Sequence, residues 1–428
     1  MPDSWRYVLM VAFHFPPCRG SSGLQRSLSF SRYLPAYGWN TLVLSAHPIA
    51  YPERGNDQLE DIPSEVVVRR PFALDTARHL AIYGRYLSWT AIPDRWVSWL
   101  FSAVPSGLRL IRSYKPRVIW STYPIATAHL IGFLLHRLSG IPWVADMRDP
   151  MTEINPRTGE RAPSDPRIWK LRSWVENLVM THASRVVFAS SGAYRIYADR
   201  YPKISRDHFL IIPNGYDEQK FAQVEKEFSK PIEPRGQIVL LHSGVLYYSA
   251  DRDPSGLFEA LALLKRKGKV SPSILKIVLR ASGYEDQYRK LLEKWNIEDI
   301  VVLEPAVAYS HALREMLAAD GLLVFQGYTS NPAVPAKLYE YLRAQRPIFA
   351  LVDSQGDTAR VLTEAGVGTM VPLDSVDQIA EGLVLFLDEI RSGKSRVPDI
   401  SHVKQFSRQS QTENLAILLN QVSGCICD

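Results

Sequence analysis

The sequence predicts an α/β protein with two facing, Rossmann-like doubly wound domains and a cleft between them. The prediction rests on the length of 428 residues and on two series of short apolar runs separated by helix-like stretches. This length exceeds one ordinary hydrophobic core, so at least two domains are expected. Apolar runs that alternate with helices indicate strands buried on both faces, as in a parallel sheet covered by helices.

The first series of strand-like runs predicts an N-terminal domain over residues 1–215. Its runs are residues 7–13, 41–44, 66–68, 118–120, 143–145 and 185–189. After the first run, residues 24–37 place apolar side chains at helical spacing. Ligands of such sheets bind beyond the carboxyl ends of the strands, where we expect the functional residues.

The alternation stops after residue 215 and then restarts. Residues 216–236 are polar and contain Pro231 and Pro234, which is typical of a linker. The second series predicts another domain over residues 237–402. Its runs are residues 238–241, 277–279, 300–303, 321–325, 347–351 and 369–372.

The composition indicates a globular protein, and its positive net charge favours an anionic partner. Hydrophobic residues make up 46% and charged residues 22% of the chain, which excludes a mainly disordered, collagen-like or disulfide-scaffold protein. The net charge of +6 is small for this length. Without a recognised nucleic-acid motif, it does not argue for a nucleic acid partner.

The cysteines and apolar stretches predict a cytoplasmic protein that is soluble or peripheral to the plasma membrane. Cys18, Cys425 and Cys427 form neither a paired framework nor a good zinc site, which fits a reducing compartment. The N-terminus runs directly into a strand, so no signal peptide is expected. The most apolar stretch, residues 125–138, is too short to span a membrane.

A glycine-containing loop after the first strand is the first candidate binding site. Gly20 and Gly23 allow a ligand to approach the backbone closely, and the following helix start suits a phosphate. An ordinary strand-to-helix turn explains the same residues.

The second candidate site lies around residues 331–342. Pro335 is typical of a first helical position, which places Lys337 in the first turn, where its charge opposes the helix dipole. A bound diphosphate would remove this conflict, and Glu340 would accept hydrogen bonds from a ribose. A solvated lysine and a surface glutamate are the alternative.

The third candidate comprises residues 242–244 and 251–254. Asp251 and Asp253 invite a metal–diphosphate interpretation, but Asp253-Pro254 is also an ordinary helix start, which we favour. In that case Arg252 lies at a helix start, where it is expected to act as a phosphate clamp. Residues 146–150 also end an apolar strand with charges, which points to function at that strand end.

Residues 78–117 predict contact with an anionic membrane surface. Seven cations and the single acid Asp94 give this segment a charge of +6, with aromatic residues interleaved. Trp96 and Trp99 are expected in the headgroup layer, and Arg109, Arg112 and Lys115 near the lipid phosphates. Core aromatics with solvated arginines are the alternative.

Taken together, these segments resemble glycosyltransferase family 4, group 1, whose members have the GT-B fold. The resemblance covers nearly the whole chain and rests on five motifs in the family's order. They are Phe15-Pro16-Pro17 with the glycine loop, residues 146–150, residues 212–217, Ser243-Gly244 through Arg252-Asp253-Pro254, and residues 335–342. It implies a retaining, metal-independent transfer without a cofactor, from a nucleotide sugar in the C-terminal domain to an acceptor in the N-terminal domain. Residues 403–428 are then expected to form a helix that crosses back to the N-terminal domain.

The resemblance also implies residue roles. Arg252 and Lys337 would stabilise the departing diphosphate, and Glu340 would hold the ribose. The family's first glutamate falls on Pro332, which leaves Asn331 as its substitute, and the family's arginine falls on Val245.

On the acceptor side, Arg148 is expected to bind substrate. Asp149 either orients the acceptor or braces the cleft. The expected acceptor is a glycan, lipid-linked, in bacterial envelope polysaccharide synthesis. The alternatives are a nucleotide-sugar 2-epimerase of the same fold and a catalytically inert scaffold protein.

Overall fold

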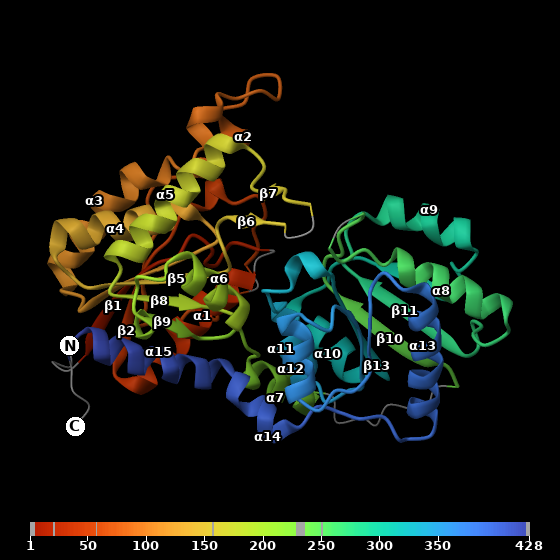
Figure 1. Cartoon of the computed structure of the whole chain (residues 1–428). Helices are drawn as coiled ribbons and strands as arrows, with labels where there is room; N and C mark the ends of the chain where they lie inside the picture. Colours follow the sequence, from red (N-terminus) through yellow and green to blue (C-terminus); the bar gives the residue numbers. More distant parts are fainter. Residues whose placement is uncertain are drawn as a thin grey trace. The chain divides into compact units, whose positions relative to one another are not determined.

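The protein folds into two compact units, each built on a parallel sheet (Figure 1). The computed structural model describes residues 5–19, 22–56, 58–155, 158–227, 236–249 and 251–424. The first unit comprises Met1–Asn214 with Arg408–Asp428, and the second comprises Gly215–Ser407. The predicted α/β class with two doubly wound domains is confirmed.

In the described part of the first unit, seven parallel strands have the order β3-β2-β1-β4-β5-β8-β9. Their bounds are β1 (Arg6–Val11), β2 (Trp39–Leu44), β3 (Val67–Arg69), β4 (Val118–Thr122), β5 (Trp143–Arg148), β8 (Arg185–Phe188) and β9 (Phe209–Ile211). A short antiparallel pair, β6 (Glu153–Ile154) and β7 (Arg161–Ala162), lies outside this sheet. The central strands β2, β4 and β5 are buried along their whole length, as their apolar residues require.

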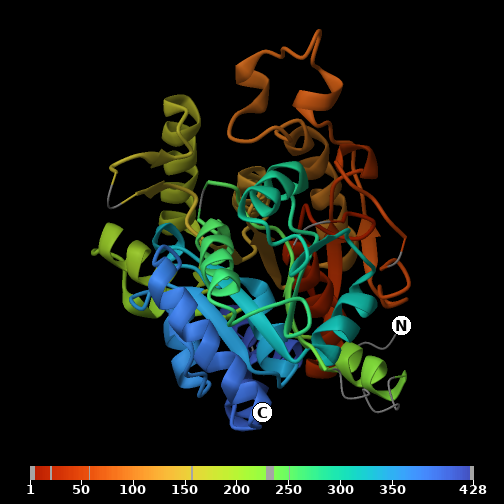
Figure 2. The same cartoon turned by 90° about the vertical axis from the view of Figure 1, so that its right-hand side faces the viewer.

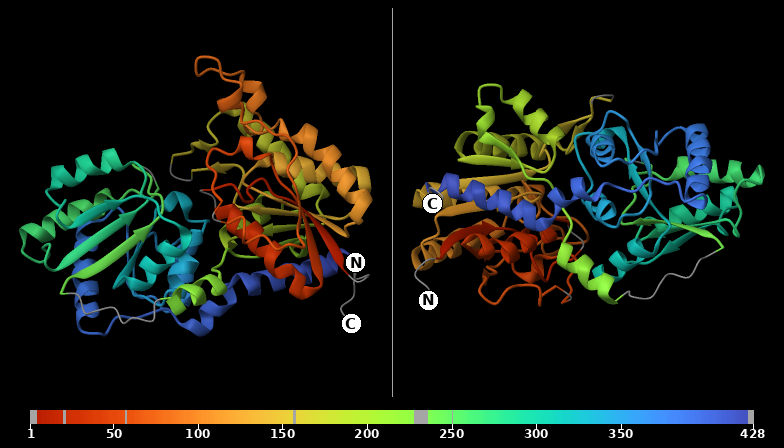
Figure 3. Two further views of the ribbon diagram at one scale, coloured as in Figure 1. Left: turned by 180° about the vertical axis from the view of Figure 1, so that it is seen from behind. Right: turned by 90° about the horizontal axis from the view of Figure 1, so that it is seen from below.

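The helices of the first unit include the last helix of the chain. They are α1 (Ser22–Tyr33), α2 (Thr76–His79), α3 (Trp99–Tyr114), α4 (Ala126–Ser139), α5 (Pro166–His182), α6 (Ser191–Arg200) and α15 (Arg408–Val422). Helix α15 packs on α1, and Figure 3 shows it in blue along the first unit. Leu415, Leu418 and Leu419 of α15 enter the core, and the Asn420 side chain accepts a 2.9 Å hydrogen bond from the indole of Trp39. The chain thus returns to its first unit at the end.

The second unit has the strand order β12-β11-β10-β13-β14-β15 in its described part, again all parallel. Its strands are β10 (Ile238–Ser243), β11 (Leu275–Arg280), β12 (Val301–Glu304), β13 (Gly321–Gln326), β14 (Ile348–Val352) and β15 (Met370–Val371). Its helices are α7 (Glu218–Glu227), α8 (Ser255–Arg266), α9 (Glu285–Trp295), α10 (Tyr309–Ala318), α11 (Ala336–Arg343), α12 (Asp357–Glu364), α13 (Val376–Arg391) and α14 (Ile400–Val403). Two hydrophobic clusters pack in this unit.

Every predicted strand run overlaps a strand of the structure, but two local predictions differ. Strands β6, β7 and β9, of two or three residues each, were not predicted. The helix predicted over 24–37 is α1 followed by the 3₁₀ turn Leu34–Tyr37, since Pro35 cannot continue the α-helical hydrogen bonds.

The predicted linker over 216–236 is wrong for its first part. Residues Glu218–Glu227 form α7, whose Phe221 and Val224 are buried in the core of the second unit. These two side chains are three positions apart and share one face of a helix whose other positions are mostly polar. Residues 228–235 lie outside the described part of the chain.

Candidate functional site

The carboxyl ends of β10 and β13 bring three predicted site residues of the second unit together. These strands pair in parallel, so the residues that follow them meet at one edge of the sheet. Helix α11 begins at the same edge and supplies Lys337 and Glu340. The loop after β10 supplies Arg252, whose charge acts on Lys337, as does the charge of Glu340.

The ammonium of Lys337 is held by His242. Its Nζ lies 3.0 Å from Nε2 of the imidazole, and Nδ1 lies 2.9 Å from the carbonyl oxygen of Leu323. A carbonyl can only accept, so Nδ1 carries the proton and Nε2 accepts from the ammonium. Burial, followed by the charge of Lys337, holds the pKa of His242 well below its usual value. The partner of Lys337 is therefore neutral.

Lys337 lacks a carboxylate counter-ion within ion-pair distance among the residues that the structure describes. Burial lowers the pKa of Lys337 to about 7, with the charge of Arg252 acting in the same direction and that of Glu340 opposing it. A lysine in this state gains most from a ligand that brings negative charge. This property distinguishes it from a solvated surface lysine.

Gly244 provides the space for this ammonium. A Cβ atom at position 244 would lie 2.7 Å from Nζ of Lys337, and the backbone there has a φ of +114°. Only glycine satisfies both conditions without displacing the lysine or straining the backbone. The Ser243-Gly244 motif is thus explained by the position of Lys337.

Arg252 is oriented by Gln326 at the end of β13. Its Nε donates to Oε1 of Gln326 at 2.9 Å, and the amide nitrogen of Gln326 donates to the carbonyl oxygen of Ser330 at 3.2 Å, which fixes the amide orientation. Nε also lies 3.7 Å from Asp251, and the guanidinium packs over the ring of Tyr247. In the described part of the chain, neither terminal nitrogen of Arg252 has a hydrogen-bonding partner.

The remaining predicted residues of the second unit have polar partners. Glu340 accepts a 2.7 Å hydrogen bond from the hydroxyl of Tyr309. The side-chain amide of Asn331 donates to Asp353 at 2.9 Å, and the backbone carbonyl oxygen of Asn331 accepts from the backbone N–H of Asp357. Asn331 therefore holds the loop before α12.

Asp253 stabilises the start of α8. Its carboxylate accepts a 3.0 Å hydrogen bond from the backbone N–H of Ser255 and a further bond from the Ser255 hydroxyl. This is the helix-start interpretation that we favoured. Among the described residues, no group of three or more His, Cys, Asp or Glu side chains is arranged to hold a metal ion.

In the first unit, Arg148 is the last residue of β5 and Asp149 follows it at the carboxyl edge of the sheet. Arg148 has a φ of +59°, is buried, and donates to the carbonyl oxygen of Tyr123 at 3.1 Å. The β5–β8 register shifts between Asp146 and Arg148, and Asp149 is partly buried. His14, beyond β1, was not predicted, and burial, followed by the charge of Arg148, lowers its pKa to about 4.

The glycine loop differs from its prediction. Gly23 is the second residue of α1 and is buried, and its carbonyl oxygen accepts from the Ser27 hydroxyl at 3.1 Å. It therefore belongs to the helix and not to the loop before it. Gly20 lies outside the residues that the structure describes.

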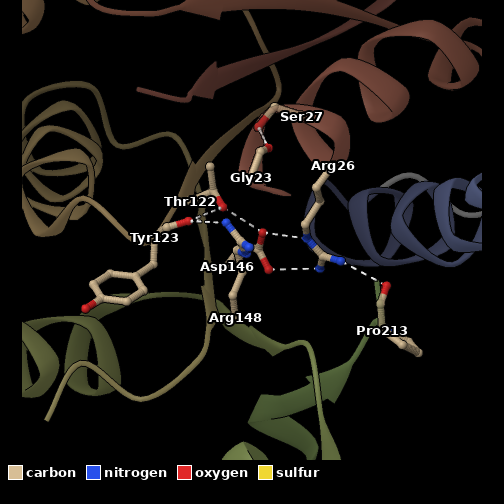
Figure 4. Close-up of polar contacts among 8 residues, drawn as sticks. All are labelled: Gly23, Arg26, Ser27, Thr122, Tyr123, Asp146, Arg148 and Pro213. Carbon is tan, nitrogen blue, oxygen red and sulfur yellow. Dashed lines mark hydrogen bonds and ion pairs between the residues drawn. The ribbon is translucent and has the colours of Figure 1, made fainter. Parts of the chain in front are cut away.

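The charge of Asp146 serves the fold of the first unit, which corrects its interpretation as a sign of function. Its two carboxylate oxygens accept from Nε and Nη2 of Arg26 at 2.9 and 3.0 Å, and the Thr122 hydroxyl donates at 2.8 Å (Figure 4). Arg26 also donates to the carbonyl oxygen of Pro213 at 3.0 Å, and both charged side chains are almost fully buried. Four segments of the unit are joined in this way.

Arg26 was missed, although the sequence contained a signal. It lies four residues before Phe30, on the apolar face of the predicted helix. A charge on a buried face needs a buried partner, and Asp146 directly follows the apolar run of residues 143–145.

Residues 78–117 do not form the single surface that was predicted. Trp99 is completely buried in the core, and the partly buried Trp96 donates from its indole to the carbonyl oxygen of Ala50 at 3.1 Å. Both are therefore core aromatics, and their predicted place in a headgroup layer is wrong. Arg109, Arg112 and Lys115 are exposed on and just after α3. No helix in the described ranges has the length and apolar character needed to cross a membrane.

Residues 25–215 match the model of the glycosyl transferase 4-like domain family. The resemblance to glycosyltransferase family 4 is thus confirmed for the first unit. Among proteins of curated function, a sequence search gives no significant match.

Solved structures with the GT-B fold are similar over nearly the whole chain. Sucrose-phosphate synthase from Thermosynechococcus elongatus has a TM-score of 0.67 and 13% identity, covering 99% of this chain and 100% of that one. Anabaena HepE in complex with UDP has a TM-score of 0.60 and 12% identity, with coverages of 97% and 100%. The lipopolysaccharide outer core galactosyltransferase WaaB has a TM-score of 0.58 and 13% identity, with coverages of 96% and 99%. The protein has the GT-B fold.

Replacing Asp146 should destabilise the first unit. Asp146→Asn leaves the buried Arg26 guanidinium without a counter-charge, and we expect a loss of roughly 3–5 kcal/mol in the free energy of unfolding, measured by denaturant titration. Asp199→Asn is the control, because Asp199 and Arg206 form an exposed pair at 4.0 Å, whose loss costs at most about 1 kcal/mol. Equal effects of both substitutions would contradict the assigned role of Asp146.

Replacing Lys337 should stabilise the unliganded protein. Lys337→Gln keeps a donor for His242 but removes the charge, so the free energy of unfolding should rise by roughly 0.5–2 kcal/mol at pH 7. The pKa of Lys337 is lower in the folded than in the unfolded chain, so protonation favours unfolding. The gain should therefore be full below about pH 7 and shrink as the pH rises towards 10. A loss of stability at pH 7 would show that the charge supports the fold.

Proposed function

We propose that the protein is a retaining, metal-independent glycosyltransferase that moves a sugar from a nucleotide-diphosphate donor to a glycan acceptor. The observation that carries the proposal is the pair of cations in the second unit. Lys337 has a neutral partner, and Arg252 has two terminal nitrogens without partners in the described residues. Retention and metal independence rest on the resemblance to glycosyltransferase family 4.

In this proposal, the cations stabilise the leaving group. When the glycosidic bond to the donor breaks, negative charge develops on the diphosphate, and preorganised cations lower the energy of that transition state. Gln326 binds Nε of Arg252, so the two terminal nitrogens of the guanidinium are left for the diphosphate. His242 holds the ammonium of Lys337 in place. Val245, which occupies the family's arginine position, contributes no charge, so Lys337 supplies the second one.

Glu340 is proposed to hold the ribose. Its carboxylate, which accepts the 2.7 Å hydrogen bond from the Tyr309 hydroxyl, offers acceptor oxygens for the ribose hydroxyls. HepE, solved with UDP and with UDP-glucose, supports a nucleotide-sugar donor. The bonds of Asn331 to Asp353 and Asp357 favour a supporting role for this residue.

The first unit is proposed to bind the acceptor at the carboxyl edge of its sheet. Arg148 ends β5 and Asp149 follows it at that edge. A lipid-linked glycan in bacterial envelope polysaccharide synthesis is the proposed acceptor, with the protein in the cytoplasm, peripheral to the inner face of the plasma membrane. The similarity to WaaB supports the envelope role.

Removing either cation should abolish transfer without unfolding the protein. The purified protein is incubated with a panel of UDP-, GDP- and dTDP-sugars and glycan acceptors, and products are identified by mass spectrometry. With the donor that reacts, Arg252→Ala and Lys337→Ala should each lower kcat by about 10²-fold or more, as losses of transition-state stabilisation do.

The matched control is Arg289→Ala on α9. Arg289 is an exposed cation of the same unit, paired with Asp286, and its replacement should leave turnover unchanged. Circular dichroism and thermal unfolding show whether each variant is folded. Normal turnover in both cation variants contradicts the assignment, and an epimer formed from donor alone contradicts the transfer reaction.

A further inference from the structure

Residues 80–87 of the first unit form a built turn, which we call the exposed turn. Ile82 and Arg85 exchange backbone hydrogen bonds of 2.8 and 3.0 Å. Tyr83 and Gly84 between them have φ angles of +49° and +74°. Two successive left-handed residues make a type I′ turn, which closes a tight hairpin. The side chains are thus presented by a defined backbone.

The exposed turn carries an unusual density of apolar side chains in contact with solvent. The exposed fractions are 45% for Leu80, 74% for Ile82, 101% for Tyr83, 43% for Tyr86 and 64% for Leu87. Scattered single apolar residues are normal on a surface, but five exposed apolar residues within eight positions are a concentration that points to an interaction site. The core of the first unit does not use them.

The base of the exposed turn is fixed to the unit. Asp75 accepts from the backbone of Ala77 at 3.1 Å and pairs with Arg95, and the Thr76 hydroxyl donates to the carbonyl oxygen of Thr90 at 2.7 Å. Figures 1 and 2 show this segment, in orange, projecting beyond the sheet of the first unit. The turn is therefore a supported projection.

The charged side chains within the segment that carries the exposed turn are cations, with the acids Asp75 and Asp94 buried at its two ends. Residues 76–93 contain Arg78 and Arg85 and no Asp or Glu. Arg85 is exposed, and Arg78 donates to the carbonyl oxygen of Tyr51 at 2.7 Å. Exposed apolar groups with nearby cations match the boundary of an anionic bilayer, where arginine meets phosphate and aliphatic or aromatic groups enter the headgroup layer.

We propose that the exposed turn is a membrane-contact element, which inserts Ile82, Tyr83 and Leu87 into the headgroup layer of an anionic bilayer. This inference rests on the proposed peripheral location and assigns the membrane contact to residues other than Trp96 and Trp99. The 16 residues of α3 span about 24 Å, and the exposed turn precedes the N-terminus of this helix in the sequence. The C-terminal half of α3 contains Arg109 and Arg112, and Lys115 follows the helix. The contact does not depend on them.

The test measures binding of the full-length protein to vesicles by co-sedimentation. Binding to vesicles with 30% anionic phospholipid should exceed binding to neutral vesicles and should weaken as salt rises. Replacing Ile82, Tyr83 and Leu87 together by Ser should weaken binding about tenfold or more, since buried apolar groups contribute to interfacial affinity. Arg85→Glu should weaken it further. Phe101→Ser is the matched control, because this side chain on α3 is 77% exposed but lies outside the turn.

A second readout reports insertion directly. An environment-sensitive dye is attached through Tyr83→Cys, in a protein with Cys425→Ser and Cys427→Ser, while the buried Cys18 remains. Its emission should shift to shorter wavelength on anionic vesicles, whereas dye attached through Phe101→Cys should not change. Equal binding of the Ser variant and the wild type, binding to neither vesicle, or an unchanged emission would overturn the proposal and favour a protein partner. None of these outcomes depends on transferase activity.

Discussion

The second unit is organised around one constraint: a lysine ammonium among buried groups is held by an imidazole instead of a carboxylate. Because Nδ1 of His242 is committed to a backbone carbonyl, Nε2 accepts from Lys337 without neutralising its charge. Gly244 leaves room for the ammonium, and Arg252 adds a second positive charge nearby. The folded protein thus carries an electrostatic cost that an anionic ligand removes. Such an arrangement is typical of a binding site and not of a stabilising ion pair.

Most strands of the two sheets were predictable because they are short, continuous apolar runs. A strand of a parallel sheet is buried on both faces, which requires such a run. The failures arose where the local signal was weak. Strand β9 was missed although its three residues are apolar, while β3, of the same length, was predicted. Helix α7 is so polar that its sequence was interpreted as a linker, despite the buried Phe221 and Val224. Trp96 and Trp99 were misplaced because composition does not show which aromatic side chains of the segment pack against the core.

The candidate site was predictable only in part. The sequence places Arg252 in the loop after a strand, and Lys337 and Glu340 in the first turns of a helix that follows a strand. Such positions lie at the carboxyl edge of a parallel sheet, so these three residues could be predicted. Their partners depend on which strands are neighbours: Gln326 meets Arg252 because β13 lies beside β10, and no spacing in the sequence encodes this. For the same reason the pairing of Arg26 with Asp146 was not predicted. These residues are 120 positions apart in the sequence, yet they form the main buried pair of the first unit.

The most direct test of this account is the number of protons taken up when the donor binds. Calorimetric titration at pH 8, in two buffers of different ionisation enthalpy, measures this number. Lys337 has a pKa of about 7 in the unliganded protein, so it is mostly neutral at pH 8 and must be protonated to hold the diphosphate. The account predicts uptake approaching one proton per bound donor, abolished in Lys337→Gln. Tight binding without proton uptake by the wild type would contradict it.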